Sequence, residues 1–571
     1  MALKGIDRRS FLRAIALSLT SVGLSGSIAS AAGRALPSSG SSTDAVGEPF
    51  DPLACLIQEA SPFTDAISTG YDRVVTGRIH GFTVPRGERW RVKGLVRTDK
   101  NVIVKGTLVM RAGDTLRFVG VDESRFVGGG LDPVASDVGL WVMGRGRLDL
   151  QGSRKVGWNR TGNHSTWRDG DEIRVAPTAA GESRGFSRFV RGSQVPRVAD
   201  LPPAEVFNLT RTVRIEGTPG HRAHVFIRSE RPQTLRFVTF RYLGPNKHDQ
   251  LVTGRWPIHF HNCHDGSRGS IVEGCVVRDA GGHAFVAHMS HGVTFRDCVA
   301  YHVRGDAFWW DVDEVTNDTV YEHCLAGGID PESHDFNPQA WHVNTGFFLG
   351  KGEGNVVQNC TAVGVGGGNA ASGFHWPSKA NSFPGAWLAR DLVSHNNSSC
   401  GAFLWQNDHP VDHVIERFVA YRNGRVGVFH GAYQNRFQFI DSWLADNPMG
   451  IDQLSAVRKA ETMIRHNRAR IGGGDVAVRI GEHKAPPTAP TLYESCSFVG
   501  QSDIPVLIDD RKRNESLIDF VRCTVNTRDL EPADFRIQSM HPAGRIRIQR
   551  IDGMALLLDH TGTATEIAAF A

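Results

Sequence analysis

The residues best suited to chemistry lie in three short segments near the middle of the chain. Each segment alternates apolar side chains with histidine, valine, tryptophan or aspartate. The segments are Ile258-His259-Phe260-His261, Phe285-Val286-Ala287-His288 and Phe308-Trp309-Trp310-Asp311. Alternate side chains of a β-strand point to the same face, so one face of these strands would be apolar and inward. The other face would carry the histidines and the aspartate.

The outward residues at the ends of the segments suit metal binding and proton transfer. If the segments are neighbouring strands, His261, His288 and Asp311 align at a spacing of about 4.8 Å. His259 would lie beside the first of them. Imidazoles with a carboxylate bind divalent metals such as Zn²⁺, and they also suit acid–base catalysis. The structural alternative is a ladder of side chains that only hydrogen-bond along the protein.

A repeated cysteine indicates the architecture that would bring these strands together. Similar segments surround Cys275, Cys298, Cys324, Cys360, Cys496 and Cys523. The first three cysteines are 23 and 26 residues apart, which is the wrong spacing for a metal site. A period in the low twenties, built of short strands and turns, is typical of a β-solenoid. We therefore predict an all-β chain with a right-handed parallel β-helix, in which the cysteines form an internal ladder.

The chain divides into six predicted segments. Short alternating strands between glycine and aspartate residues indicate a small N-terminal β domain, and a loop-rich stretch follows it. The segments are a signal peptide (1–31), a linker or N-terminal extension (32–71), the small β domain (72–152), a connector (153–208), the parallel β-helix (209–530) and a C-terminal β cap (531–571).

The first residues have the form of a twin-arginine export signal. Arg8 and Arg9 precede an apolar stretch, and Ala29-Ser30-Ala31 offers a cleavage site. No later stretch reaches 18 continuous apolar residues, so we expect a periplasmic or extracellular protein without stable membrane insertion. Residues 1–31 hold four basic residues and one acidic residue, so cleavage lowers the net charge from +4 to about +1. That charge gives no electrostatic basis for binding nucleic acid.

Further residues near the histidines suit the binding of a sugar polymer. Outward aromatic rings on a solenoid can stack on sugar rings, and amide and imidazole groups can hydrogen-bond to hydroxyls. The candidate substrate-binding residues are Trp309, His375, Trp376 and Trp405. Packing in the core is an equal alternative for Trp376 and Trp405.

The first histidine segment also resembles a known family. Gly254-Arg255-Trp256-Pro257-Ile258-His259-Phe260-His261 resembles the Arg-Tyr-Pro-Ile/Val-His-Phe-His segment of the vertebrate cell-surface hyaluronidases, the group of the cell-migration-inducing hyaluronan-binding protein and the fibrocystin-like proteins. Val286-Ala287-His288 and residues 305–311 are similar to later segments of that family, and residues 72–152 are similar to its eight-glycine domain. The chain departs from the family at Asp306, where the family has histidine, and at Asp311, where it has glutamate.

The resemblance implies a polysaccharide-active or polysaccharide-binding β-helix that depends on a divalent cation such as calcium. The histidines themselves favour zinc, since calcium prefers oxygen ligands, and the identity of the metal stays open. The candidate metal ligands are His259, His261, His288 and Asp311.

Two classes of function remain at this point. In an enzyme, either a hydrolase or a lyase, His261 or His288 would act as the base, Arg255 would hold a substrate carboxylate, and Asp311 would orient the base or bind the metal. The alternative is a non-catalytic carbohydrate-binding or surface-structural solenoid.

Overall fold

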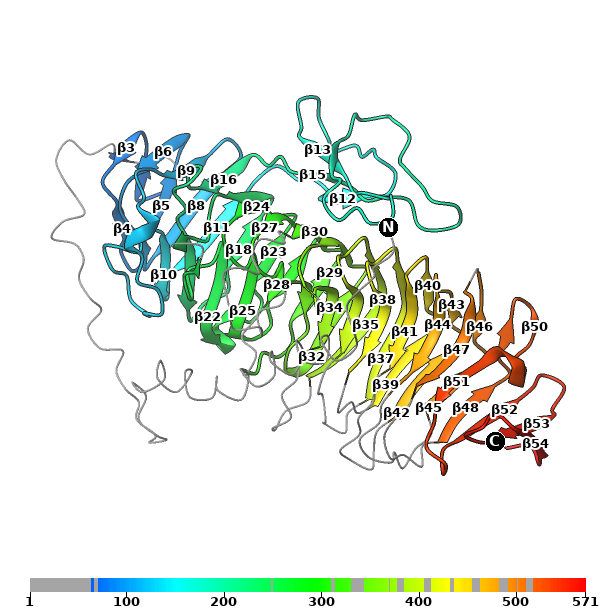
Figure 1. The fold of residues 1–571 in the computed structure, drawn as a ribbon. Coiled ribbons are helices and arrows are strands. Elements are labelled where there is room, and N and C mark those ends of the chain that lie inside the picture. Colours follow the sequence, from blue (N-terminus) through cyan, green and yellow to red (C-terminus); the bar gives the residue numbers. More distant parts are fainter. Residues whose placement is uncertain are drawn as a thin grey trace, which may run out of the picture.

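The computed structural model describes residues 63–65, 70–247, 250–309, 314–329, 344–368, 370–376, 385–404, 412–431, 436–453, 463–481, 491–500, 502–509 and 517–570. These residues form an elongated parallel β-helix whose coils stack along one axis (Figure 1). Helix within this part of the chain is limited to three short 3-10 turns: η3 (Glu123–Arg125), η4 (Asp265–Ser267) and η6 (Pro532–Asp534). The predicted all-β parallel β-helix is confirmed. None of these turns has the length or apolar character needed to cross a membrane.

Most coils contribute one strand to each of three faces. The first face contains β2 (Arg73–Val75), β5 (Arg89–Val92), β8 (Thr107–Arg111), β11 (Arg147–Gln151), β18 (Thr234–Arg236), β23 (Ile271–Glu273), β26 (Thr294–Arg296), β29 (Val320–Glu322), β32 (Gly352–Gln358), β39 (Arg436–Ile440), β42 (Met463–Asn467), β45 (Thr491–Glu494), β48 (Leu517–Val521) and β52 (Arg545–Gln549). The second face contains β3 (Arg78–Ile79), β6 (Leu95–Thr98), β9 (Thr115–Phe118), β16 (Val213–Glu216), β19 (Val238–Arg241), β24 (Val276–Ala280), β27 (Val299–Val303), β30 (Leu325–Ile329), β33 (Thr361–Val365), β40 (Trp443–Ala445), β43 (Arg470–Ile471), β46 (Ser497–Phe498) and β49 (Thr524–Val525).

Two long strands, β35 (Gly385–His395) and β37 (Asp412–Tyr421), run across both of these faces and join them into one sheet. The third face is a separate 15-stranded parallel sheet. It contains β4 (Phe82–Val84), β7 (Val102–Val104), β10 (Leu140–Gly144), β17 (Val225–Ser229), β22 (Ile258–His264), β25 (Phe285–Ser290), β28 (Phe308–Trp309), β31 (Thr345–Phe348), β34 (Ser372–Trp376), β36 (Cys400–Leu404), β38 (Val426–His430), β41 (Met449–Gln453), β44 (Val476–Ile480), β47 (Ile504–Asp509) and β51 (Phe535–Ser539).

The remaining strands lie at the ends of the stack or outside it. They are β1 (Phe63–Asp65), β12 (Trp158–Asn159), β13 (Ile173–Val175), β14 (Ser187–Arg188), β15 (Val206–Asn208), β20 (Asn246–Lys247), β21 (Gln250–Leu251), β50 (Arg528–Asp529), β53 (Ala555–Leu558) and β54 (Ala564–Ile567). At the C-terminal end, β52, β53 and β54 pair antiparallel, in contrast to the parallel pairing of the coils.

Inward side chains of successive coils stack on one another and form a continuous core. On the third face, the rings of Phe285, Phe308, Phe347 and Phe374 follow each other at centroid distances of 4.8, 4.6 and 5.0 Å. A single coil cannot bury its own apolar face, so this stacking supplies the burial that each coil lacks. The stacked phenylalanine rings also hold the third-face strands in register.

The predicted cysteine ladder is present inside the core. Cys275, Cys298, Cys324 and Cys360 are fully buried and unpaired by disulfides. Each thiol lies 3.2–3.6 Å from a backbone carbonyl of the preceding coil, to which it can donate. The residue just before each cysteine has a positive φ, near 50–60°, as at Asp297 and His323. This residue makes the turn between the first and second faces.

Residues 72–152 belong to the same stack as the coils that follow. The strands β8, β11 and β18 pair in parallel in that order, and so do β10, β17 and β22. These pairings differ from the small β domain that the sequence predicted. The reason is that the parallel sheets continue on both sides of residues 153–208, which form an insertion within one coil.

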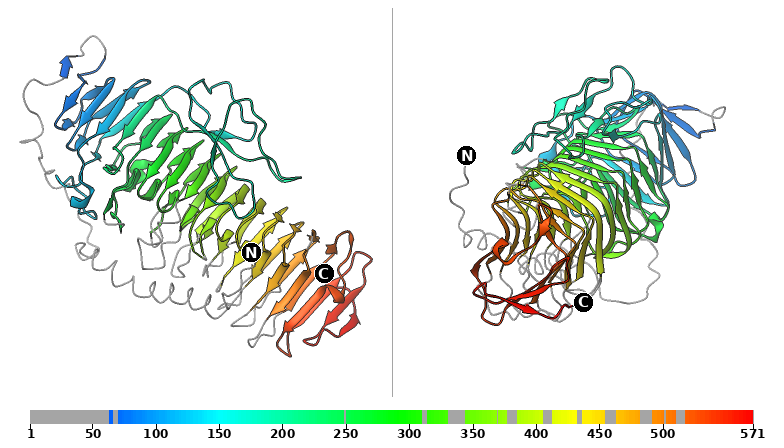
Figure 2. Two further views of the ribbon diagram at one scale, coloured as in Figure 1. Left: turned by 45° about the horizontal axis from the view of Figure 1, so that its top comes forward. Right: turned by 90° about the vertical axis from the view of Figure 1, so that its right-hand side faces the viewer.

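The insertion, residues 153–208, forms the four-stranded sheet β12-β15-β13-β14 and lies along one side of the solenoid (Figures 1 and 2). Trp158 and Phe207 pack against Val276 and Val299 of the second face. Glu205 is completely buried between the insertion and the solenoid. Its carboxylate lies 2.8 Å from both His395 Nε2 and Arg160 Nη2. The insertion therefore has a defined position on the coils.

Candidate functional site

The strands β22 and β25 place the predicted histidines on one outward surface. The parallel register pairs Ile258 with Phe285, and His261 with His288. The apolar members of these strands face the core, where Phe260 and Ala287 are fully buried. The predicted register is confirmed here. It follows from the alternation itself, since a shift by one residue would place the imidazoles in the core.

The structure brings three of the predicted ligands together as a histidine triad, His259, His261 and His288. One nitrogen from each ring lies within 4.8 Å of the other two. His261 Nδ1 is 3.2 Å from His259 Nε2 and 3.0 Å from His288 Nδ1. A tetrahedral zinc ion with bonds of about 2.0–2.1 Å needs ligand nitrogens roughly 3.3 Å apart. Two of the three edges therefore match this requirement to within a few tenths of an ångström.

Three neutral imidazoles cannot form a hydrogen bond across both of these short nitrogen–nitrogen contacts. His259 Nδ1 lies 2.8 Å from Gly254 O, so this nitrogen carries the proton and donates it, and Nε2 keeps its lone pair. His261 Nδ1 has two nitrogen neighbours, and a single N–H can point to only one of them. A cation among the three nitrogens would accept all three lone pairs. Three nitrogens in this arrangement could hold one metal ion.

Burial keeps His259 and His261 in the form that binds metals. Only 1% of His259 is exposed, and burial followed by the neighbouring charges of His261 and His288 holds its pKa well below the usual value. Burial, followed by the charge of His288, lowers the pKa of His261 to about 3. At neutral pH these two rings are therefore unprotonated, as a metal ligand must be.

Arg255, predicted to hold a substrate carboxylate, lies in the wall of the site with 1% of its surface exposed. Its Nε donates to Asp137 Oδ2 over 2.8 Å, and its Nη2 donates to Gly130 O over 2.9 Å. The guanidinium also stacks over Trp141 at 4.7 Å. This arrangement corrects the prediction, because the charge of Arg255 is already neutralised by a buried carboxylate.

The predicted aromatic surface is mostly packed. Trp376 shares the inward side of β34 with Phe374 and is 1% exposed, so the prediction that it binds substrate is wrong. Trp309 faces outward but is 7% exposed, because its ring stacks on His283 at 4.2 Å. His375 is 6% exposed, with its ring next to those of Phe348 and Phe403.

Two predicted residues, Asp311 and Trp405, lie outside the described residues. The part of the chain that the structure describes therefore contains three of the four predicted metal ligands.

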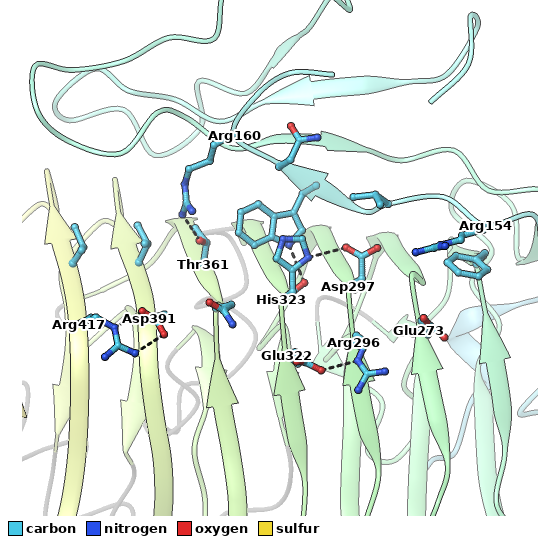
Figure 3. Close-up of a pocket in the computed structure, with 17 residues that line it drawn as sticks. Arg154, Arg160, Glu273, Arg296, Asp297, Glu322, His323, Thr361, Asp391 and Arg417 are labelled. Atoms are coloured by element: carbon cyan, nitrogen blue, oxygen red, sulfur yellow. Dashed lines mark hydrogen bonds and ion pairs between the residues drawn. The ribbon is translucent and has the colours of Figure 1, made fainter. Parts of the chain in front are cut away.

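Sequence reasoning missed a second polar site, on a different part of the solenoid. His323 Nδ1 lies 3.0 Å from Asp297 Oδ1 at the turn between the first and second faces, beneath the insertion (Figure 3). Both residues directly precede a cysteine of the repeat. Aligning the repeats on their cysteines would have placed them on neighbouring coils, but not beside residues 154–160 of the insertion.

Comparison with known proteins agrees with the central part of this picture. The family model described as the CEMIP beta-helix matches residues 221–367, which include the histidine triad. No curated protein matches the chain.

The solved structures found to be similar include three phage tailspikes. They are the receptor-binding domain of the siphovirus 9NA tailspike (10% identity, 86% of this chain and 81% of that chain, TM-score 0.24), the tailspike gp61 of Pseudomonas phage phi297 (11%, 80% and 74%, 0.23) and the Gp54 tailspike of Acinetobacter baumannii bacteriophage AP22 in complex with a capsular saccharide (9%, 81% and 74%, 0.20). We draw no functional argument from TM-scores this low.

Proposed function

We propose that this chain is an exported polysaccharide-active protein that binds a divalent metal ion at the histidine triad and depolymerises an extracellular glycan there. The observation that carries the proposal is the convergence of three imidazole nitrogens, of which two pairs lie 3.0 and 3.2 Å apart. The match of residues 221–367 to the CEMIP beta-helix supports a role for this same region. A uronic-acid-containing, hyaluronan-like polymer is the substrate class that we favour.

The donor set favours zinc over calcium. Imidazole nitrogens suit Zn²⁺, whereas Ca²⁺ takes six to eight oxygen ligands. His259 is oriented by its hydrogen bond to Gly254 O, the kind of backbone contact that fixes the tautomer of a zinc-bound histidine. Bound zinc would supply a Lewis acid toward the oxygens of a sugar or of water. Three protein ligands would leave the fourth position of a tetrahedral site open.

Calorimetric titration of the metal-free protein with ZnCl₂ and with CaCl₂ tests the metal site. We expect one zinc per chain, weak or no calcium binding, and loss of zinc binding in His261→Ala. His264→Ala is the matched control, because His264 lies on the same strand but is exposed and outside the triad. Saturating zinc at one hundred times Kd should stabilise the folded protein by about 2.7 kcal/mol. Equal zinc binding by both variants would contradict the proposed site.

Release of reducing ends from a panel of acidic and neutral polysaccharides tests the activity. We expect the zinc-loaded protein to cleave an acidic polymer, the His261→Ala variant to be inactive, and the His264→Ala variant to remain active. The alternative is a non-catalytic carbohydrate-binding or surface-structural solenoid. It predicts zinc and glycan binding without new reducing ends, and this result would refute the enzymatic proposal alone.

A further inference from the structure

A cavity lies away from the histidine triad, between the insertion and the turns of the solenoid. It has a volume of about 760 Å³, within the range of ligand sites in proteins. Figure 3 shows the insertion above the cavity and the strands of the first and second faces below it. Its roof is formed by residues 154–160 and its floor by the turn that precedes each repeated cysteine.

The cavity extends along the stack of coils. Its floor includes Glu273, Arg296, Glu322, Asn359, Asp391 and Arg417. These residues lie in or directly after strands of successive coils, β23, β26, β29, β32, β35 and β37, which pair in that order, and Asn359 directly follows β32. Five intervals of roughly 4.8 Å make a floor roughly 24 Å long. That length suits a stretch of an extended polymer better than a compact metabolite.

The acidic groups of the floor already have cationic partners. Glu322 accepts from Arg296 Nε over 2.6 Å, and both oxygens of Asp391 accept from Arg417, over 2.5 and 2.7 Å. Glu273 lies 3.3 Å from Arg236 Nε. The carboxylates are thus neutralised, and they hold donors and acceptors in fixed positions along the cavity. A bound cation would gain little from them.

Two side chains on the cavity wall can still form hydrogen bonds to a ligand. Arg154 is exposed and makes no hydrogen bond or ion pair with another described residue. His323 Nδ1 is oriented by Asp297, which also accepts from Gly157 N over 2.8 Å, and the His323 ring stacks on Trp158 at 4.3 Å. His323 Nε2 has no hydrogen-bond partner in the described part of the chain, and 38% of the side chain is exposed. Among the described residues, the wall therefore offers the guanidinium of Arg154 and the oriented imidazole of His323 to a ligand.

We infer that this cavity binds a uronate-containing oligosaccharide, as a glycan site separate from the histidine triad. Arg154 pairs with a sugar carboxylate, His323 Nε2 hydrogen-bonds to a sugar hydroxyl, and the ion-paired floor supplies further donors and acceptors. The inference concerns binding only and holds whether or not the triad cleaves the polymer.

Calorimetric titration with defined oligosaccharides tests this inference in the presence of a metal chelator, so that the triad contributes no metal-dependent binding. The acidic probes are decasaccharides of hyaluronan and of polygalacturonate, and the neutral probe is cellohexaose. We expect at least one acidic probe to bind and the neutral probe to bind at least about tenfold more weakly, because a charge-assisted hydrogen bond is lost.

Substitutions in the cavity and at the triad test where the acidic probe binds. Arg154→Ala and His323→Ala should each lower the affinity for the acidic probe about tenfold or more. His261→Ala should leave this affinity unchanged. Arg468→Ala is the matched control, since Arg468 pairs with Asp441 at the equivalent turn but outside the cavity. Arg154 has no described partner, so its loss should leave thermal stability unaltered. Absence of binding by both acidic probes, equal binding of the neutral probe, or equal effects of Arg154→Ala and Arg468→Ala would overturn the inference.

Discussion

Replacing Glu205 by glutamine should loosen the insertion from the solenoid. Burial alone would raise the pKa of the Glu205 carboxyl, but the charges of His395 and Arg160 outweigh it and lower the pKa from 4.5 to about 2. A displacement of this size corresponds to roughly 3 kcal/mol of folded-state stability. The Glu205→Gln variant keeps the shape and a hydrogen-bonding oxygen but removes the charge. We therefore expect it to lose a few kcal/mol at neutral pH.

The pH dependence follows from the direction of the shift. A carboxyl with a lowered pKa in the folded state stabilises the protein fully above its unfolded pKa of 4.5. That stability is lost as the pH falls from 4.5 toward 2, because the unfolded chain takes up the proton first. The free energy of unfolding of the wild-type protein should fall more steeply over this pH range than that of the Glu205→Gln variant.

Hydrogen exchange of the insertion measures the effect where it occurs. The amide of Gly157 donates to Asp297 of the solenoid, so its exchange reports on docking of the insertion. The amide of Ala176 donates to Glu205 O, so its exchange reports on backbone pairing within the insertion. Exchange at these amides should accelerate in Glu205→Gln at pH 7, and in the wild type below pH 4.5. Glu182→Gln, an exposed change in the same insertion, serves as the control. Identical exchange in the wild type and in Glu205→Gln at pH 7 would refute the reasoning.

Four further changes test the core, the wall of the triad and the export signal. Cys298→Ser should lower the free energy of unfolding by one to a few kcal/mol, about 1 kcal/mol if the hydroxyl keeps the thiol's contact with the backbone carbonyl, as measured by urea denaturation. Trp376→Ala should cost about 3–5 kcal/mol in the same assay and leave zinc binding intact, because the ring lies in the core. Arg255→Ala should lower the free energy of unfolding by about 3–5 kcal/mol, since it leaves the buried Asp137 carboxylate without its cationic partner, and a stable variant would contradict the structural role. Changing Arg8 and Arg9 together to lysine should leave precursor in the cytoplasm, and unchanged export in a fractionation assay would rule out the twin-arginine signal.

The outward position of the triad could be predicted from sequence because alternation is a local property of a strand. Phe260 has to be buried, and this requirement alone turns His259 and His261 to the outside. The same reasoning, applied to Phe374, would have placed Trp376 inward, two residues further on. The cysteine repeat indicated the coil length, and stacked coils then bring His261 next to His288.

Contacts between distant parts of the chain were decided only by the tertiary structure. Arg255 pairs with Asp137, 118 residues earlier, and no local pattern marks that partner. The sequence predicts that residues 153–208 are a connector between two domains. In the structure they fold back along the second face and place Trp158 on His323.

The physical difference between these two kinds of information is the range of the interactions. The backbone alternation and the burial of nearby apolar side chains determine which face each residue of the triad occupies. The distances of 3.0 and 3.2 Å between the triad nitrogens depend in addition on side-chain rotamers and on the hydrogen bond from His259 to Gly254. The cavity beneath the insertion exists because a segment inserted in one coil packs on several later ones, and only the assembled fold specifies that placement.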